Sequence, residues 1–194
     1  LNDQTFYDYE LINRSTNTYH DMYIAFWTDG DIGGATDDYV ACDVNRGLGY
    51  MYNGDNYDDD YQGNTGYHGN PPAAGMDIIS GPYTDADGED NASNWDTVNG
   101  VKTLNCSAAD FMNGNINGQN FGDGIVDNER WGMHYFMPFH CCGQGVSPTL
   151  TTPHTASDQY KYMTGHWKDN TQLVYGGTGH HSGSDSDVHT NFMF

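Results

Sequence analysis

The chain has 194 residues and is strongly acidic, with 27 Asp and Glu against 6 Lys and Arg and a formal net charge of −21. Charge of this sign repels nucleic acid and anionic membranes, so nucleic acid is not an expected partner. No run of about 18 apolar residues and no basic, apolar leader occurs, so no membrane insertion is expected. Phe, Tyr and Trp together number 27, which is unusual for a disordered acidic chain, and we therefore predict a single folded domain over residues 1–194.

The acidic residues are divided unevenly: 24 are Asp and only Glu10, Glu89 and Glu129 are Glu. A surface that is acidic only for solubility can use Glu freely. Asp instead favours turns, and its short side chain can place carboxylate oxygens around a cation in a loop. We therefore favour loops that bind divalent cations, with halophile-like or generic acidic solvation as the alternative.

Short strands joined by long loops are predicted along the chain, because aromatic and β-branched runs recur between Gly, Asn and Asp clusters. Residues 5–12 alternate between apolar and acidic side chains, as a half-buried strand does. Residues 22–27 are apolar on both faces and are typical of a central strand. The other predicted strands are 39–43, 48–53, 75–79, 101–104, 131–137, 173–175 and 192–194. About nine strands predict an all-β fold that is β-sandwich-like, a jelly roll or a relative, and rich in loops.

One stretch favours a helix, in which Ser157 caps a short run from residue 158 to Gly165. The loops at 54–72 and 84–100 are too long for simple hairpins, and such loops are usually functional, tied by metal or disordered. The chain closes on Phe192, Met193 and Phe194, which resemble a strand cut from a longer parent. We therefore expect a fragment of a longer multidomain surface protein.

Four clusters of Asp with Gly or Asn predict calcium-binding loops, because alternating Asp and Gly lets several oxygens face one point. The predicted ligands are, in chain order, Asp29, Asp31, Asp37 and Asp38; Asp55; Asp85, Asp87 and Asp90; and Asp123 and Asp127. None of the clusters is an EF-hand, because the flanking helices and the twelfth-position Glu are missing. A plain Asp/Gly turn or a solvated loop tip is the alternative for each cluster.

The four cysteines, Cys42, Cys106, Cys141 and Cys142, form no CxxC and no zinc-ligand spacing with His. Their even number predicts disulfides rather than a metal site, and so an oxidising, extracytoplasmic location. Three pairings are possible. A bond between the adjacent Cys141 and Cys142 would be strained. We therefore favour bonds in which Cys42 and Cys106 each join one of these two residues, or join each other.

Catalytic chemistry has little support in the sequence. His180, His181 and His189 share a loop with Asp185 and Asp187, but no HExxH occurs, and a Gly/Ser/His-rich surface loop is the common explanation of such a segment. No G-x-S-x-G motif occurs either. Paired carboxylates can be drawn from 27 acids at will, so we predict no catalytic residues and keep a hydrolase as the least favoured function.

Aromatic side chains are the better functional lead. Trp95 and Trp167 are the predicted ligand-binding residues, because a Trp ring beside an acidic loop could stack on a sugar ring next to calcium. Most other aromatic residues must lie in the core, since the chain offers little Leu and Val to bury. A calcium-dependent carbohydrate-binding module is therefore an alternative to a purely structural or adhesive module.

Several short sequence strings, spread over nearly the whole chain, together carry a resemblance to a known family. They are Trp27-Thr28-Asp29-Gly30-Asp31, Thr36-Asp37-Asp38-Tyr39-Val40, Cys42-Asp43, Gly47-Leu48-Gly49-Tyr50, Tyr52-Asn53-Gly54-Asp55, Asn70-Pro71-Pro72-Ala73-Ala74-Gly75, residues 122–130, residues 165–169 and Tyr175-Gly176-Gly177. In this order they resemble a module of large surface and secreted proteins from bacteria with the type IX secretion system. In that family a Pro-Gly-Asp follows the final Phe-Met-Phe and a sorting domain lies far downstream; neither is in this sequence, which agrees with a fragment.

The resemblance implies a secreted location on the outside of a Gram-negative cell and a non-catalytic module in a long multidomain chain. Together with the Asp loops, the cysteines and the loop-rich strands, it favours part of an adhesin, filament or surface layer, with extracellular glycans or other surface proteins as expected partners and self-association as a further option. It supplies no ligand and no catalytic residue. Asp96-Thr97-Val98 is similar to the short O-glycosylation acceptor of such bacteria, which makes Thr97 a predicted glycosylation site.

Overall fold

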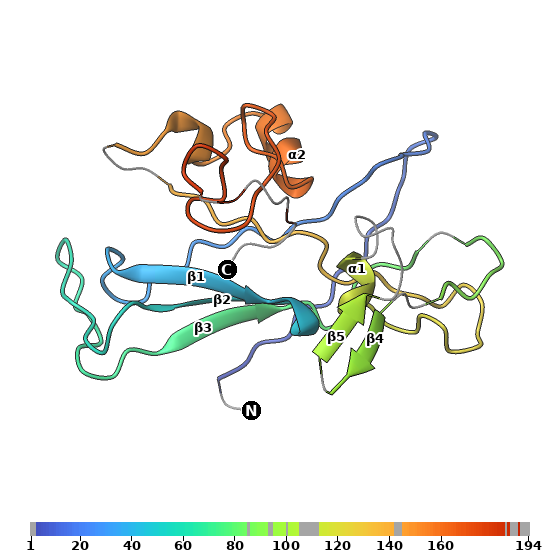
Figure 1. Cartoon of the computed structure of the whole chain (residues 1–194), viewed down its shortest axis with the longest axis horizontal. Coiled ribbons are helices and arrows are strands. Elements are labelled where there is room, and N and C mark those ends of the chain that lie inside the picture. The colour runs from blue at the N-terminus through green and yellow to red at the C-terminus, as the bar shows by residue number, and fades with distance from the viewer. Residues whose placement is uncertain are drawn as a thin grey trace.

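The computed structural model describes residues 3–84, 86–92, 95–99, 101–104, 113–141, 145–184, 186 and 190, with the backbone alone at 95–98, 101–104 and 113. This part of the chain is mostly loop, with a three-stranded antiparallel sheet, a two-stranded sheet and few short helices (Figure 1). In Figure 1 the C-terminal region with α2 lies above the three-stranded sheet, and the two-stranded sheet lies beyond one end of it.

The three-stranded sheet contains β1 (Asp38–Asp43), β2 (Leu48–Asn53) and β3 (Ala73–Asp77), in the order β1-β2-β3. The three strands confirm the predictions at 39–43, 48–53 and 75–79 to within two residues at each end. The 3-10 helix η1 (Val44–Arg46) reverses the chain after β1, and Gly47 ends it with φ 65°, in the left-handed region that favours Gly. The register pairs Asp38 with Asn53, which brings two of the predicted acidic loops to one end of the sheet.

The second sheet is a hairpin of β4 (Trp95–Val98) and β5 (Val101–Leu104). The strand predicted at 101–104 is confirmed, whereas β4 falls in a segment that we expected to be loop. Asn99 has φ 52°, and Asn-Gly is the preferred sequence for a two-residue hairpin turn. The Asn99-Gly100 pair was therefore the local signal for β4.

The helices are short. α2 (Ala156–Met163) confirms the predicted helix, but its N-cap is Thr155 rather than Ser157. Thr155 and Asp158 form a capping box, and the hydrogen bonds from Thr155 hold the pKa of Asp158 below its usual value. α1 (Asn113–Ile116) and the 3-10 helix η3 (Pro148–Leu150) were not predicted. The longest described helix has eight residues and a bilayer needs about 20, so no described helix could cross a membrane.

Two small apolar clusters form the core of the described part. The larger contains Leu150, Tyr162, Trp167 and Leu173, with Met137, Phe139 and Val146 packed against it. The smaller contains Cys42 and Met133, with Val44, Ile78 and Phe136. Gly49 on β2 is required here, because a Cβ at that position would lie 2.7 Å from the ring of Phe136. The second cluster therefore joins the sheet to the segment that leads toward α2.

The strands predicted at 5–12 and 22–27 are wrong. Both segments run without strand pairing in an arm at the N-terminal end of the chain, and their large apolar side chains are mostly exposed. The rings of Tyr9 and Phe26 are 5.7 Å apart, and the Tyr160 hydroxyl on α2 donates to the carbonyl of Asp21 at 3.1 Å. Alternation of apolar and polar side chains predicts which face of a strand would be buried. A strand also needs a neighbouring strand to pair with, and in the described part of the chain these segments have none.

The strands predicted at 131–137 and 173–175 are also wrong, since each provides only a single bridge residue. Side chains and turns satisfy the backbone of the first segment instead: the amide oxygen of Asn117 accepts the N–H of Met133, and the carbonyl of Gly114 accepts that of Gly132. The strand predicted at 192–194 lies outside the described residues. The two described sheets do not form the predicted sandwich.

Candidate functional site

The first two Asp clusters meet around Asp58, whose side chain is fully buried (0% exposed). Its two carboxylate oxygens accept the N–H of Gly34 at 2.7 Å and that of Tyr67 at 2.6 Å. The N–H of Gly54 also donates to the carbonyl of Asp37 at 2.7 Å. Residues 29–38 and 53–60 thus form one unit, which we name the first acidic pair.

Three buried oxygens in the first acidic pair have no hydrogen-bond partner: Oδ1 of Asp37, Oδ1 of Asp38 and Oδ1 of Asn53. Asp38 and Asn53 are opposite each other in the β1–β2 register, so their side chains share one face of the sheet. Burial raises the pKa of Asp38; the N–H of Ile32 opposes the rise, and the nearby carboxylates, Asp37 foremost, add to it. A bound cation would relieve this repulsion and use the unpartnered oxygens.

The third and fourth Asp clusters also meet, and we name residues 86–91 and 120–129 the second acidic pair. The two oxygens of Asp90 accept the N–H groups of Gly122 at 2.9 Å and Gly124 at 2.7 Å. In return, Oδ1 of Asp127 accepts the N–H of Gly88 at 2.9 Å. Carboxylates of each loop therefore hold the backbone of the other.

Glu129 is the most unusual residue of the second acidic pair, because its side chain is 0% exposed. Its Oε1 accepts the N–H of Asn91, but its Oε2 is buried with no hydrogen-bond partner. Oδ1 of the neighbouring Asn128 is also buried and has no hydrogen-bond partner. The adjacent Arg130 does not neutralise Glu129, because its guanidinium lies 3.7 Å from the ring centre of Tyr83 and donates to the carbonyl of Gly81.

The other predicted metal ligands take up varied positions. Asp29 and Asp31 are exposed on their loop. The remaining described ligands accept backbone N–H groups of their own loops: Asp55 from Tyr57, Asp87 from Glu89 and Asp123 from Ile125. Asp85 lies outside the described residues.

Sequence reasoning missed four residues of these two units as site residues: Asn53, Asp58, Asn128 and Glu129. Asn53 and Asp58 stood within the second cluster, and Asn128 and Glu129 are the last two residues of the fourth. Nothing in the local sequence distinguishes them, because what sets them apart is burial, and burial depends on the partner loop.

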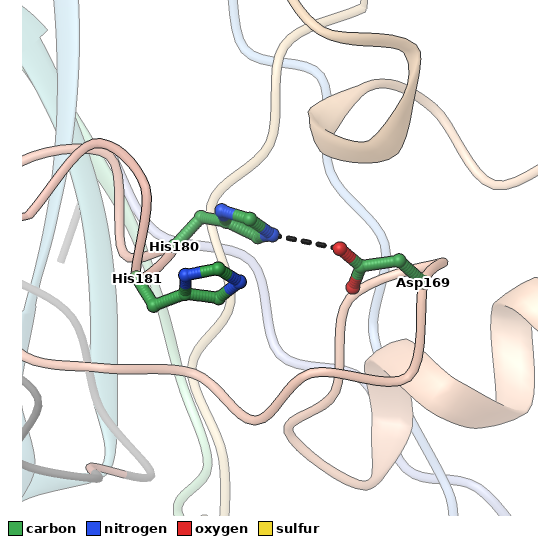
Figure 2. A group of neighbouring side chains, drawn as sticks. All are labelled: Asp169, His180 and His181. Carbon is green, nitrogen blue, oxygen red and sulfur yellow. Dashed lines mark hydrogen bonds and ion pairs between the residues drawn. The ribbon is translucent and has the colours of Figure 1, made fainter.

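A third cluster lies in the C-terminal region, where Asp169, His180 and His181 each offer a ligand atom within 4.8 Å of the others. Figure 2 shows the two imidazoles and the carboxylate converging from two separate loops. Nε2 of His180 is 2.8 Å from Oδ2 of Asp169, and the rings of His180 and His181 are 4.3 Å apart. From the sequence we had interpreted the segment that contains both His residues as a surface loop. Asp185, Asp187 and His189 of that segment lie outside the described residues.

Local turns fix two members of this cluster, Asp169 and His180. Asp169 lies in the turn between His166 and Gln172, and its Oδ1 accepts the N–H and the hydroxyl of Thr171, which leaves Oδ2 facing His180. Nδ1 of His180 is 2.7 Å from the Ser182 hydroxyl. Burial alone would raise the pKa of Asp169, but the hydrogen bonds from Thr171 and His180 outweigh it and lower that pKa to about 2.

Trp167 is not available to stack on a sugar, contrary to the prediction. It is 1% exposed, and its Nε1 donates to the carbonyl of Gly179 at 2.7 Å, so it belongs to the larger apolar cluster. Trp95 is on β4 and Thr97 two residues beyond it, with side chains outside the described part. Cys42 is buried and Cys141 is exposed, while Cys106 and Cys142 lie outside the described residues, so the disulfides stay a prediction.

An aromatic face that we had not predicted lies on the first sheet. Tyr39 and Tyr52 are opposite each other in the register and stack with ring centres 6.1 Å apart and an interplanar angle of 27°. Tyr50 is 5.9 Å from Tyr52 on the same strand. Tyr39 and Tyr52 are exposed, and both lie beside the Asp38–Asn53 end of the sheet. We name these three residues the tyrosine face.

Comparison of the chain with protein-family models, with curated proteins and with solved structures gave no match in any of the three.

Proposed function

We propose that this chain is a calcium-stabilised structural or adhesive module of an extracellular bacterial surface protein or filament. The observation that carries the calcium part is the buried Glu129 carboxylate, with one oxygen unpartnered and no described ion pair. A buried charge without compensation destabilises a protein by several kcal/mol, so such groups are paired or bind metal. Calcium takes about six to eight oxygen ligands and tolerates irregular geometry, as a site assembled from loops requires.

The second acidic pair contains oxygens of the kind that calcium binds, but among the described residues no three carboxylates place an oxygen within 4.8 Å of one another, so calcium would have to draw them together. Glu129 and Asn128 would supply the buried oxygens, and Asp87 and Asp127 the carboxylates nearer the surface. In the first acidic pair Asp37, Asp38 and Asn53 would do the same. Calcium would hold each pair of loops together and offset the repulsion between their carboxylates, which makes its role structural.

The setting of the module rests on the sequence. The type IX resemblance supports export to the surface of a Gram-negative cell, and the exposed aromatic side chains of the arm support contact with other surface proteins or with further copies of the chain. A non-catalytic role and a β-sandwich-like architecture belong to the same proposal.

Thermal unfolding with and without calcium tests this function. We expect a midpoint several degrees lower in excess EDTA than at about 2 mM calcium, because a site filled to ten times its dissociation constant adds about 1.4 kcal/mol. Magnesium should restore little of the loss, since it requires octahedral geometry and keeps its water. The measurement is circular dichroism under non-reducing conditions.

Ionic strength needs a control, because any salt screens a charge of −21. Sodium chloride matched to the ionic strength of the calcium buffer should raise the midpoint much less than calcium does. Equal midpoints in calcium, EDTA and sodium chloride would mean that the acidic pairs are solvated loops, and the calcium proposal would be abandoned.

The tyrosine face favours a second candidate, carbohydrate binding. The exposed Tyr39 and Tyr52 and the half-buried Tyr50 form a platform of neighbouring rings beside an acidic loop, and sugar rings stack on such surfaces. In this candidate the tyrosine face takes the place of the buried Trp167 as an aromatic contact, and Trp95 stays a predicted contact.

A glycan array in the presence of calcium tests this candidate. Binding should fall about five- to thirtyfold in Tyr39→Ala, because loss of an exposed stacking contact costs on the order of 1–2 kcal/mol. Tyr7→Ala, an exposed tyrosine in the arm, should leave binding unchanged. An array with no signal, or equal binding by both variants, would remove the carbohydrate candidate.

A further inference from the structure

Asp169, His180 and His181 have the donor set of a transition-metal site, which the calcium function does not use. Two imidazole nitrogens and one carboxylate oxygen suit zinc rather than calcium, because calcium takes oxygen ligands almost exclusively. In a tetrahedral zinc site with bonds of about 2.0–2.1 Å, ligand atoms are about 3.3 Å apart. Nε2 of His180 and Oδ2 of Asp169 are hydrogen-bonded at 2.8 Å, which is shorter than that spacing, so the two atoms would move slightly apart to admit the ion.

The site is built rather than a chance meeting of surface groups. His180 is only 8% exposed, and its ring and that of the buried Trp167 are in a T-shaped arrangement with their centres 6.4 Å apart. Thr171 holds the other oxygen of Asp169, so that Oδ2 stays directed at His180. His181 is exposed, and a rotation of its side chain would bring a ring nitrogen closer to the ligand atoms of His180 and Asp169.

The Ser182 hydroxyl supplies an outer contact of the kind found at metal-bound histidines. Zinc requires Nε2 of His180 without a proton, so the single proton of the neutral ring would be on Nδ1 in the metal-bound form. Nδ1 would donate that proton to Oγ of Ser182, which is 2.7 Å away, in place of accepting the N–H of Ser182, which lies 3.2 Å from it in this structure. Such a contact fixes both the tautomer and the orientation of the ring.

We propose that Asp169, His180 and His181 bind one zinc ion, with a fourth position open to water. The ion would join the turn at 167–170 to the loop at 176–184. These two segments already meet where Nε1 of Trp167 donates to the carbonyl of Gly179. Zinc bound there would hold these two segments together beside the larger apolar cluster, and this role would not depend on the two acidic pairs.

Zinc titration of the metal-stripped chain, against a chromophoric zinc chelator and with 2 mM calcium present to occupy the acidic pairs, tests the site. We expect one equivalent of zinc to bind with a dissociation constant in the micromolar range or below. His181→Ala and Asp169→Asn should each weaken binding by at least about 100-fold, the upper limit for loss of an outer contact alone. Both residues are exposed, so both variants should fold, and melting without zinc checks this.

His154→Ala is the matched control, because it removes an exposed histidine from the same half of the chain and should bind zinc as the wild type does. Cobalt in place of zinc should give a visible absorption band of tetrahedral strength in the wild type and not in His181→Ala. Equal binding by all four proteins, or no binding by the wild type below about 100 μM, would overturn the zinc site. Glu129→Gln should bind zinc unchanged, so a failure here is separable from a failure of the calcium proposal.

Discussion

Replacement of Trp167 by Ala is expected to lower the free energy of unfolding by about 3–5 kcal/mol, the usual range for loss of a large buried aromatic side chain. The residue is 1% exposed and packs against Leu150, Tyr162 and Leu173. The variant also removes one of the two donors to the carbonyl of Gly179, which keeps the N–H of Val174 at 2.9 Å. Since small domains are stable by about 5–15 kcal/mol, this is a large fraction of the total. Urea denaturation followed by circular dichroism measures it.

Two companion variants make this result specific. Trp167→Phe keeps most of the apolar contact and loses the Nε1 donor, so it should fall between Trp167→Ala and the wild type and still be measurable if Trp167→Ala does not fold. Trp27→Ala removes a tryptophan that is 60% exposed and should change stability by no more than about 0.5 kcal/mol. Similar losses for Trp167→Ala and Trp27→Ala would show that the larger apolar cluster does not hold the fold together.

Glu129→Gln should have opposite effects with and without calcium. In EDTA the variant should be more stable than the wild type, by about 1 kcal/mol or more, because it removes a buried charge and keeps an acceptor for the N–H of Asn91. In calcium it should be less stable than the wild type, because the ion loses its buried carboxylate ligand. The measurement is the unfolding midpoint of both proteins over a calcium titration, which should show the two curves crossing.

Glu10→Gln is the matched control, since it makes the same change at an exposed position in the arm. Its melting curve should follow the wild type at every calcium concentration. Loss of stability by Glu129→Gln in EDTA and in calcium alike would mean that the carboxylate already has a partner in the calcium-free protein, and Glu129 would then not be a calcium ligand.

The local sequence was sufficient where a short pattern specifies its own structure. Residues 38–43 and 48–53 are apolar and β-branched runs separated by a turn that ends at Gly47, so the β1–β2 pair could be predicted. The short helix near residue 158 could be predicted as well, because its capping residues and its breaker are close in sequence. The bias toward Asp identified four loops, since Asp and Gly favour turns wherever they occur together.

Only the tertiary structure decided which of these loops meet and which side chains become buried. Asp58 and Glu129 are fully buried because a second loop covers each of them, and no pattern within either loop states which loop that is. Trp167 became core and the arm's aromatic side chains became surface for the same reason: hydrophobicity gives a side chain a tendency to be buried, but the rest of the chain supplies the cover. Asp169 and His180 are 11 residues apart, and it is the folding of their two turns against Trp167 that brings them within 2.8 Å.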